Sequence, residues 1–519
     1  MTMNRAQRSP DDDVNPPERQ TPSEGLTRRE VLTLLNSAAL GAYALSCGSA
    51  PRAPSALDTE LKDPLYYSSA TALAHAIRKK DLSSEEIVRV YLARIEKVNP
   101  AINAVILLAA DAALERARTA DASLARGESL GPLHGVPMTL KDSIDTAGMV
   151  STGGTLGRAN FVPERDATVA ARLRAAGAIF LGKTNTPELT GSFETNNLLF
   201  GFTHNPYDLQ RTPGGSSGGA AAIVASGGTA MDIGSDTGGS IRYPSHCCGI
   251  AGIKPTSGRV PRTGHIVPFG GILDTFTTLG PMARTVDDLI LTLPLIAGPD
   301  WRDPSIVPMP LGDPLAVDLK RLRVSFHTDN GIATPTPETM QVVRRAGEAL
   351  SAAGLSVEEV RPTGIEESLD IINAFWGAEG GYYERKVLEK AGTTKHSLTW
   401  MEEAKPITMH EFGDLIDQWD AFRVKMLTFF ENFDVILSPV NGAPAQPHAK
   451  VVDDDPTFTY TETYNLTGWP AAVIRCGTSP EGLPIGVQVV AQPWREDVAL
   501  AVASHLEKAL GGFEPPAGL

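Results

Sequence analysis

Hydrophobic residues recur with a helical period near the start of the chain and in short runs over its middle. Residues 68–100 predict two helices, and Ser83 with Glu86 has the spacing of a capping box at the start of the second. Residues 101–126 predict another amphipathic helix. From residue 131 to about 290, short apolar runs alternate with Gly/Ser/Pro loops and Ala-rich helical stretches, which is typical of an α/β sheet.

The second half of the chain returns from helices to strands. Residues 310–430 predict mostly helix, followed by strands at "VILSPV", "AAVIRCG" and "GVQVVA" and by a last helix at 496–510. The sequence has no internal repeat and no sharp change of texture after residue 60. We therefore predict one large α/β domain over residues 61–515.

The first 60 residues have a different composition. Residues 1–25 are rich in Pro, Asp, Gln and Arg, which is typical of disorder. Arg28 and Arg29 precede an uncharged run that is too weakly apolar for a membrane span, and the pair resembles a twin-arginine export signal. We predict a disordered start and signal over residues 1–46 and a linker over 47–60, hence a periplasmic or cell-envelope protein. A cytoplasmic enzyme with an ordinary N-terminal helix is the alternative.

Cysteine and histidine patterns bear on anchoring and on metals. The segment "ALSC", which ends at Cys47, resembles a lipoprotein cleavage box, except that Ala44 stands where a larger aliphatic residue is usual. Cys47 is therefore a candidate lipid anchor. Cys247, Cys248 and Cys476 are too scattered for a disulfide framework, and the adjacent pair is expected to pack as small buried side chains. "HEFGD" lacks the second histidine of a zinc motif, so we predict no metal and no cofactor.

Net charge and one motif bear on nucleic acids and nucleotides. A formal net charge of −15 repels a phosphate backbone, so we predict no nucleic-acid partner. Residues 177–184, "GAIFLGKT", match the phosphate-loop pattern G-x-x-x-x-G-K-[ST]. Such a loop needs flexible, amide-presenting residues between its glycines. Residues 178–181 are instead expected to form a buried strand followed by a loop, and we reject an ATPase.

Two segments, 211–228 and 231–264, are dense in glycine. Glycine weakens helices and strands, so this density indicates either tight turns or backbone N–H groups aimed at developing negative charge. In "SDTGGS" the residues before Ser240 can form a nest of amides around an oxyanion. "GGSSG" at 214–218 matches a nucleophile elbow, but no strand is predicted before it. His246, near Ser240 in the sequence, is expected to be a packing residue.

Five blocks resemble the successive motifs of the amidase signature family: "GPLHGVPMTLKD", "GKTNTPEL", "TPGGSSGGAAA", "GSDTGGSIRYPS" and "GIKPTSGRVPRTG". They occur in the family's order and spacing, and the resemblance extends from about residue 64 to 510 because "YNLTGWPAAVIRCGTSPEGLPIGVQVVA" also fits. It implies a single large α/β/α domain with a central mixed β-sheet flanked by helices. It also implies an amidase acting on carbon–nitrogen bonds other than peptide bonds, with esterase side activity.

The resemblance also places the family's catalytic residues on this chain. Lys141 of "TLKD" corresponds to the base, Ser216 of "GGSSGG" to the serine preceded by a cis peptide bond, and Ser240 of "DTGGS" to the nucleophile. The oxyanion hole is expected at the backbone amides of Thr237, Gly238, Gly239 and Ser240. The supporting positions correspond to Ser217, Asp236 and Arg242.

The chemistry of these residue types agrees with the implied roles. A serine hydroxyl is a weak nucleophile until a base removes its proton. Lysine can be that base only when neutral, so desolvation must lower its pKa. A second serine between the two would relay the proton and later return it to the leaving amine, with an acyl-enzyme formed on Ser240.

Two alternatives remain open beside an amidase that takes a small-molecule amide. One is the A-type subunit of a glutamine amidotransferase for tRNA, which would need partner subunits, and the other is an inactive, exported binding lipoprotein. The pocket walls are expected within residues 310–420, near Phe375, Trp376 and Tyr382. The substrate is not indicated, and the oligomeric state, a homodimer included, is left open.

Overall fold

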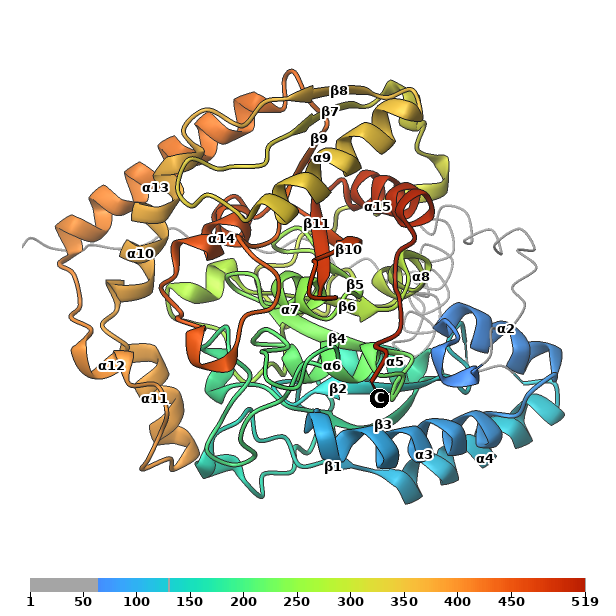
Figure 1. Cartoon of the computed structure of the whole chain (residues 1–519). Helices are drawn as coiled ribbons and strands as arrows, with labels where there is room; N and C mark the ends of the chain where they lie inside the picture. The colour runs from blue at the N-terminus through green and yellow to red at the C-terminus, as the bar shows by residue number, and fades with distance from the viewer. Residues whose placement is uncertain (1–63, 129–130, 519) are drawn as a thin grey trace, which may run out of the picture. The chain divides into compact units, whose positions relative to one another are not determined.

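The computed structural model describes residues 64–128 and 131–518, which belong to one compact unit, Glu60–Leu519 (Figure 1). The predicted signal over residues 1–46, the linker over 47–60 and the candidate anchor Cys47 lie outside the described residues. No helix in the described part of the chain combines the length and apolar character needed to cross a membrane.

The larger of two sheets has eight strands in the order β4-β6-β5-β10-β11-β9-β7-β8. These strands are β4 Met231–Asp236, β5 Ala251–Lys254, β6 Thr278–Ala283, β7 Arg323–Phe326, β8 Ser356–Glu359, β9 Val435–Pro439, β10 Ala471–Thr478 and β11 Pro484–Ala491. Strand β7 runs parallel to β8 and β9, whereas the other neighbours are antiparallel, so the sheet is mixed as predicted.

A smaller sheet has three strands in the order β1-β3-β2. Its strands are β1 Val105–Leu108, β2 Pro137–Lys141 and β3 Ile179–Thr184. Strand β2 is parallel to β3 and lies beside β4 of the larger sheet. The carboxyl end of β2 is therefore next to the larger sheet.

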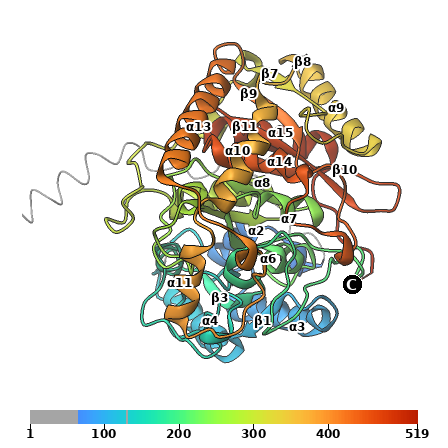
Figure 2. The same ribbon diagram turned by 90° about the vertical axis from the view of Figure 1, so that its left-hand side faces the viewer.

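Helices surround both sheets (Figure 2). They are α2 Ala70–Lys79, α3 Ser84–Ile102, α4 Ala110–Ala125, α5 Thr168–Ala175, α6 Gly218–Ala225, α7 Arg242–Cys247, α8 Val286–Ile296, α9 Pro337–Ala352, α10 Ser368–Ala378, α11 Tyr382–Ala391, α12 Trp400–Glu403, α13 Met409–Phe429, α14 Thr459–Leu466 and α15 Glu496–Leu510.

Two glycines show that helices cover both faces of the larger sheet. A Cβ added at Gly477 of β10 would meet Val342 of α9, and one added at Gly486 of β11 would meet His246 of α7. Gly477 pairs with the neighbour of Gly486, and successive strand residues point to opposite faces. Helices α7 and α9 therefore lie on opposite faces, and α15 packs with both α8 and α9. The predicted α/β/α class is confirmed.

Local predictions hold best where a helix has its own start signal. Helix α3 follows Ser83, whose side chain and that of Glu86 form the capping box, and α15 begins at the predicted residue. The segment predicted as one helix over 101–126 is instead β1 followed by α4, because β1 pairs with β3. The region 310–430, expected to be mostly helical, also contains β7 and β8.

The phosphate-loop match belongs to β3, which continues through Lys183 and Thr184 rather than ending in the predicted loop. Its glycine, Gly182, lies against the carbonyl of Leu107, where a Cβ would come within 2.0 Å of the oxygen. Lys183 is buried and donates hydrogen bonds to the carbonyl oxygen of Ile144 and to a threonine hydroxyl. The amine of Lys183 is therefore bonded to other groups inside the protein.

Candidate active site

The site is centred on a buried lysine at the end of a strand. Lys141 is the last residue of β2 and is fully buried. Its Nζ lies 2.7 Å from the Oγ of Ser216, 2.9 Å from that of Ser217 and 2.9 Å from that of Ser235. The sequence singled out the first two of these serines but not Ser235.

The protonation of these groups follows from their hydrogen bonds. Burial lowers the pKa of Lys141 well below its ordinary value, although two buried aspartates, Asp236 and Asp232, act in the opposite direction. A neutral amine has two N–H bonds and one lone pair, so it donates to two hydroxyls and accepts from the third. Ser217 directs its own hydroxyl to the carbonyl of Ser235 at 3.3 Å. In the neutral form of Lys141, the proton aimed at Nζ would then come from Ser216 or Ser235, and Ser216 is closer.

The two serines from "GGSSGG" lie on the loop that enters α6. The peptide bond between Gly215 and Ser216 is cis. A Cβ at Gly215 would come within 2.6 Å of the carbonyl carbon of Phe193, so this part of the loop is packed against neighbouring backbone. The amide of Ser217 donates to the carbonyl of Ser240 at 3.2 Å. This bond joins the loop to the candidate nucleophile.

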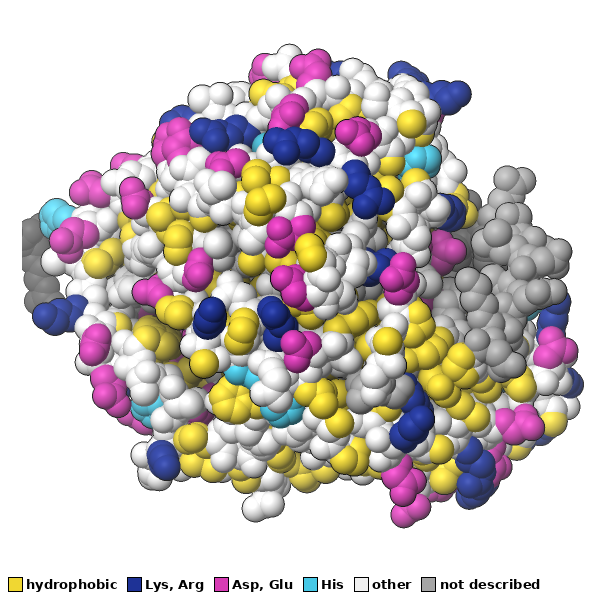
Figure 3. Space-filling model, in the orientation of Figure 1, with side chains coloured by type: hydrophobic (Ala, Val, Ile, Leu, Met, Phe, Trp, Pro, Cys, Tyr) yellow, Lys and Arg dark blue, Asp and Glu magenta, His cyan; other side chains and the backbone are white. Residues whose placement is uncertain are grey.

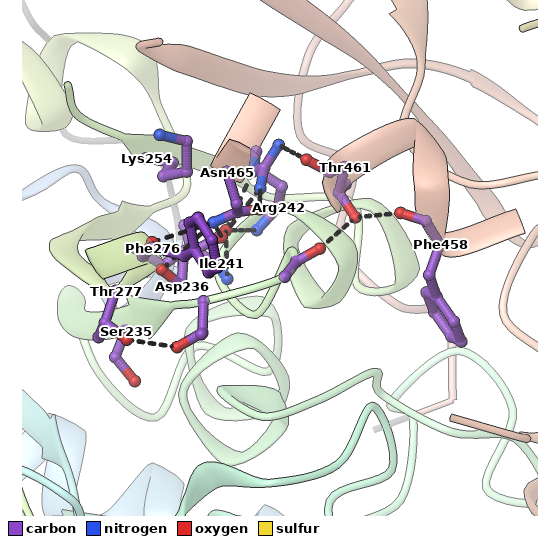
Figure 4. Close-up of polar contacts among 12 residues, drawn as sticks. Ser235, Asp236, Ile241, Arg242, Lys254, Phe276, Thr277, Phe458, Thr461 and Asn465 are labelled. Carbon is purple, nitrogen blue, oxygen red and sulfur yellow. Dashed lines mark hydrogen bonds and ion pairs between the residues drawn. The ribbon is translucent and has the colours of Figure 1, made fainter. Parts of the chain in front are cut away.

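The loop between β4 and α7 carries Ser240. Gly239 has a φ of +143°, and a Cβ there would lie 2.3 Å from the Oγ1 of Thr461 on α14. That hydroxyl donates a 2.6 Å hydrogen bond to the carbonyl of Gly238 (Figure 4). The loop therefore needs glycine here for both its backbone conformation and its close approach to α14.

A buried ion pair fixes the two ends of this loop. Arg242 donates to both carboxylate oxygens of Asp236, and Asn465 on α14 donates to the same aspartate (Figure 4). Burial alone would raise the pKa of Asp236, but the Arg242 charge and these hydrogen bonds lower it to about 2. Other Arg242 N–H groups donate to Gln488 Oε1, to the carbonyl of Thr461 and to Asn465 Oδ1. Asp236 and Arg242 thus hold the loop between β4 and α14.

A cavity of about 710 Å³ opens onto Thr237, Gly238 and Ser240. The hydroxyl of Ser240 makes no hydrogen bond to another described residue, and its side chain lines this cavity. The aromatic part of the wall comprises Phe193, Phe202, Trp376, Tyr383 and Trp400. The cavity therefore has the Ser240 hydroxyl and the backbone of this loop in one part of its wall and several aromatic side chains in the rest.

Of the three aromatic residues predicted to lie near the cavity wall, one lines the cavity. Trp376 lines the cavity, but Phe375 packs in the core against Phe276 and Trp419, because successive residues of a helix point about 100° apart. Tyr382 is largely exposed at the start of α11, and its neighbour Tyr383 lines the cavity instead.

Other wall residues come from segments that the sequence did not single out, at 187–194 and 451–462. Ser235 had a signal in the sequence, since it belongs to the "GSDTGGS" block. Thr461 and Glu462 had none, because they are more than 200 residues from the loop they contact.

The neighbouring histidine and cysteines are packing residues, as predicted. His246 is buried, with Nε2 at 3.0 Å from the carbonyl oxygen of Ala443 and Nδ1 accepting from the amide of Gly486. Cys247 and Cys248 are also buried. Burial lowers the pKa of His246 to about 4, so this side chain is neutral at ordinary pH.

Comparison with known proteins assigns the family. Residues 86–500 match the Amidase family. The chain is 36% identical over 478 residues to the A-type subunit of glutamyl-tRNA(Gln) amidotransferase from Moorella thermoacetica, which covers 86% of this chain and 97% of that protein. It is 34% identical to the same protein of Carboxydothermus hydrogenoformans, over 86% of this chain and 97% of that protein. The chain belongs to the amidase family and is a hydrolase of carbon–nitrogen bonds by that membership.

Solved structures of amidase-signature enzymes share the fold. 6-Aminohexanoate cyclic dimer hydrolase aligns with a TM-score of 0.79 at 28% identity, over 87% of this chain and 99% of that one. A bacterial aryl acylamidase aligns with a TM-score of 0.78 at 26% identity, over 88% of this chain and 99% of that one. The mixed sheet with flanking helices is therefore the amidase-signature architecture.

Replacing Gly239 by alanine should disable the loop. The added Cβ meets Thr461 Oγ1 and demands an unfavourable φ, so the amides around residue 239 must move. We expect kcat/KM for amide hydrolysis to fall by about 100-fold or more, the scale of losing an oxyanion donor. Initial rates with one amide that the wild type hydrolyses give kcat/KM for both proteins.

The matched control is Gly482→Ala. Gly482 also has a positive φ, +85°, but a Cβ there meets nothing within 4 Å. It should lower stability by about 1 kcal/mol through the backbone alone and leave kcat/KM unchanged. Equal activity of the two variants would contradict the role given to the loop.

Proposed function

We propose that this protein is an amidase that hydrolyses its substrate through an acyl-enzyme on Ser240. The observation that carries the proposal is the contact between the buried amine of Lys141 and the hydroxyl of Ser216, at 2.7 Å. Ser216 lies on a loop whose next residue, Ser217, donates a backbone hydrogen bond to the carbonyl of Ser240. A lysine with a lowered pKa beside a chain of hydroxyls is the arrangement that a serine nucleophile needs when no histidine serves it.

The first half of the reaction forms the acyl-enzyme. Ser240 Oγ attacks the amide carbonyl carbon, Ser216 takes the Ser240 proton and passes its own to the neutral Nζ of Lys141. The carbonyl oxygen becomes an oxyanion, and the amides of residues 237–240 stabilise it. The proton then returns through Ser216 to the nitrogen as the carbon–nitrogen bond breaks, since an unprotonated amine is a very poor leaving group.

The second half releases the acid. Water loses a proton along the same path and attacks the acyl-enzyme carbonyl, and the ester bond to Ser240 breaks as that oxygen regains its proton. Esters would follow the same route, because their carbonyl places an oxyanion at the same position. Each step uses side chains and amides of this chain.

A second candidate function is that of the A-type subunit of the tRNA amidotransferase. The names of the curated relatives favour it, since two of them align with 97% of their length to this chain at 36% and 34% identity. Glutamine, however, carries an α-carboxylate that needs a cationic partner. No lysine or arginine lines the cavity in the described part of the chain. This wall supports a substrate without a carboxylate.

Ser240 should react with a fluorophosphonate. We expect one covalent adduct by intact mass, mapped to Ser240, because this probe modifies only an activated serine. Ser240→Ala should show no adduct, and Ser216→Ala should slow labelling by about 100-fold, since it removes the proton relay. A folded wild type that stays unlabelled at every probe concentration would instead favour the alternative of an inactive binding protein.

The value of kcat/KM should rise with pH in a single transition, which is the limb of the pH profile that Lys141 controls. The working Lys141 is the neutral amine and its pKa is lowered by burial, so kcat/KM increases as pH rises through that pKa and then levels off. Initial rates at about pH 5 to pH 10 measure the limb. Lys141→Met should lose it together with the activity, and a wild-type rate that falls from about pH 6 to pH 9 would contradict the assignment.

The purified chain should separate the two candidate functions by its substrate. We expect kcat/KM at least about 10-fold higher for a neutral amide such as hexanamide than for glutamine, because an unpaired α-carboxylate is costly beside acidic walls. Ammonia release measures both reactions. Preference for glutamine would favour the amidotransferase function.

The cellular location of the protein is a second, independent test that distinguishes the amidase from the amidotransferase subunit. We propose export through the twin-arginine pair, and a tagged full-length chain should fractionate with the cell envelope or periplasm. The variant with Arg28→Lys and Arg29→Lys should stay in the cytoplasm. Cytoplasmic wild type would again favour the amidotransferase function, with its partner proteins.

A further inference from the structure

The charge of the cavity wall differs from that of the outer surface. On the face drawn in Figure 3, lysine and arginine side chains lie among aspartates and glutamates. The cavity wall carries seven carboxylate side chains, and no lysine or arginine in the described part of the chain. Its one histidine, His448, lies 3.1 Å from Glu194. The cavity is therefore a negatively charged compartment that ends at Ser240.

One of these carboxylates is buried beside the reacting loop. Glu462, on α14, is 6% exposed, and a Cβ at Gly238 would lie 3.4 Å from its Oε1. Oε1 accepts a 2.9 Å hydrogen bond from the indole of Trp376. Oε2 has no hydrogen-bond partner among the described residues, although the side chain lines the cavity. Oε2 is accessible from the cavity, where it can accept a hydrogen bond from a ligand.

A second carboxylate of the wall has one oxygen that is buried and has no hydrogen-bond partner among the described residues. Glu188 is 1% exposed and also belongs to the cavity wall. Its Oε2 accepts from the amide and hydroxyl of Ser397, whereas Oε1 has no partner in the described chain. An accessible oxygen of Glu462 and an unpartnered oxygen of Glu188, in a wall where the described residues include no lysine or arginine, favour a ligand donor that carries positive charge.

The aromatic wall fits the same kind of ligand. Trp376, Tyr383 and Trp400 line the cavity, and ring faces attract ammonium groups. Trp376 both contacts Glu462 and presents an indole to the cavity. An apolar chain that ends in an ammonium would satisfy the rings along its length and the carboxylate at its end.

We propose that the substrate is an amide that carries a protonated amino group and no carboxylate, bound by Glu462 Oε2 against Trp376. This inference rests on the proposed amidase function and names its substrate class. The carboxylate orients the ammonium while the amide carbonyl reaches the loop at residues 237–240, so Glu462 is a specificity-determining residue. Burial raises the pKa of Glu462 to about 7, and a bound ammonium favours its ionised form.

Binding to Ser240→Ala tests the proposal without turnover. Three anilides with the same four-methylene chain are titrated by calorimetry: the isosteric anilides of 5-aminopentanoic acid and hexanoic acid, and the monoanilide of adipic acid. A second pair, hexanoyl amides of 1,4-diaminobutane and of pentylamine, carries the charge on the leaving side. We expect the ammonium member of at least one series to bind about 10-fold tighter than its neutral isostere, and the carboxylate to bind weakest.

Glu462→Gln in the same background identifies the residue. Glutamine keeps an acceptor for the Trp376 indole but removes the charge, so the ammonium preference should fall below about 2-fold while neutral binding stays unchanged. Glu384→Gln is the matched control, because it removes a partly exposed charge from the same wall. It should retain at least half of the preference.

The outcomes separate this inference from the proposed function. Equal binding of the isosteres, tighter binding of the carboxylate, no measurable binding, or an unchanged preference in Glu462→Gln overturns the inference. Fluorophosphonate labelling of Ser240 in the wild type does not depend on any of these results. A labelled enzyme without ammonium preference would be an amidase with a different substrate class.

Discussion

The burial of one amine governs the arrangement of this site. Lys141 is placed inside the protein at the end of β2, where water cannot stabilise its charge. Its hydrogen-bonding needs are met by three serine hydroxyls from two further segments, the loop before α6 and strand β4. A neutral amine in this position requires hydroxyl neighbours, because carboxylates in contact would restore the charge. The smaller sheet, the loop and the larger sheet are thereby joined at a single nitrogen.

Asp236 lies one residue beyond Ser235, and its charge opposes the larger effect of burial on the pKa of Lys141. The carboxylate is engaged by Arg242 and Asn465, and this pairing keeps it directed toward α7 and α14. A buried carboxylate with a dedicated arginine is stable as an ion, whereas one left beside Lys141 would favour the ammonium form. The pairing with Arg242 and Asn465 therefore gives the buried charge of Asp236 partners other than Lys141.

The sequence predicted the parts of this protein that depend on local signals. The capped helix α3, the last helix α15 and the strands after residue 430 follow from periodicity and capping. Strand β1 was missed because only pairing with β3 defines its four residues. The candidate triad was found through its motifs, and the structure brings Lys141 and Ser216 into contact. The cavity wall could not be predicted in the same way, because which aromatic residue faces the site depends on how each helix is rotated, as Phe375 and Trp376 demonstrate.

Helix α14 divides two tasks between its sides. Thr461 and Asn465, four residues apart and hence on one side, hold the loop and Asp236. Glu462 projects about 100° away from Thr461 and faces the cavity. Glu462 nevertheless also lies against Gly238, so the residue that lines the cavity touches the same loop. The wall of the cavity and the backbone that carries Ser240 are therefore supported by consecutive residues of one short helix.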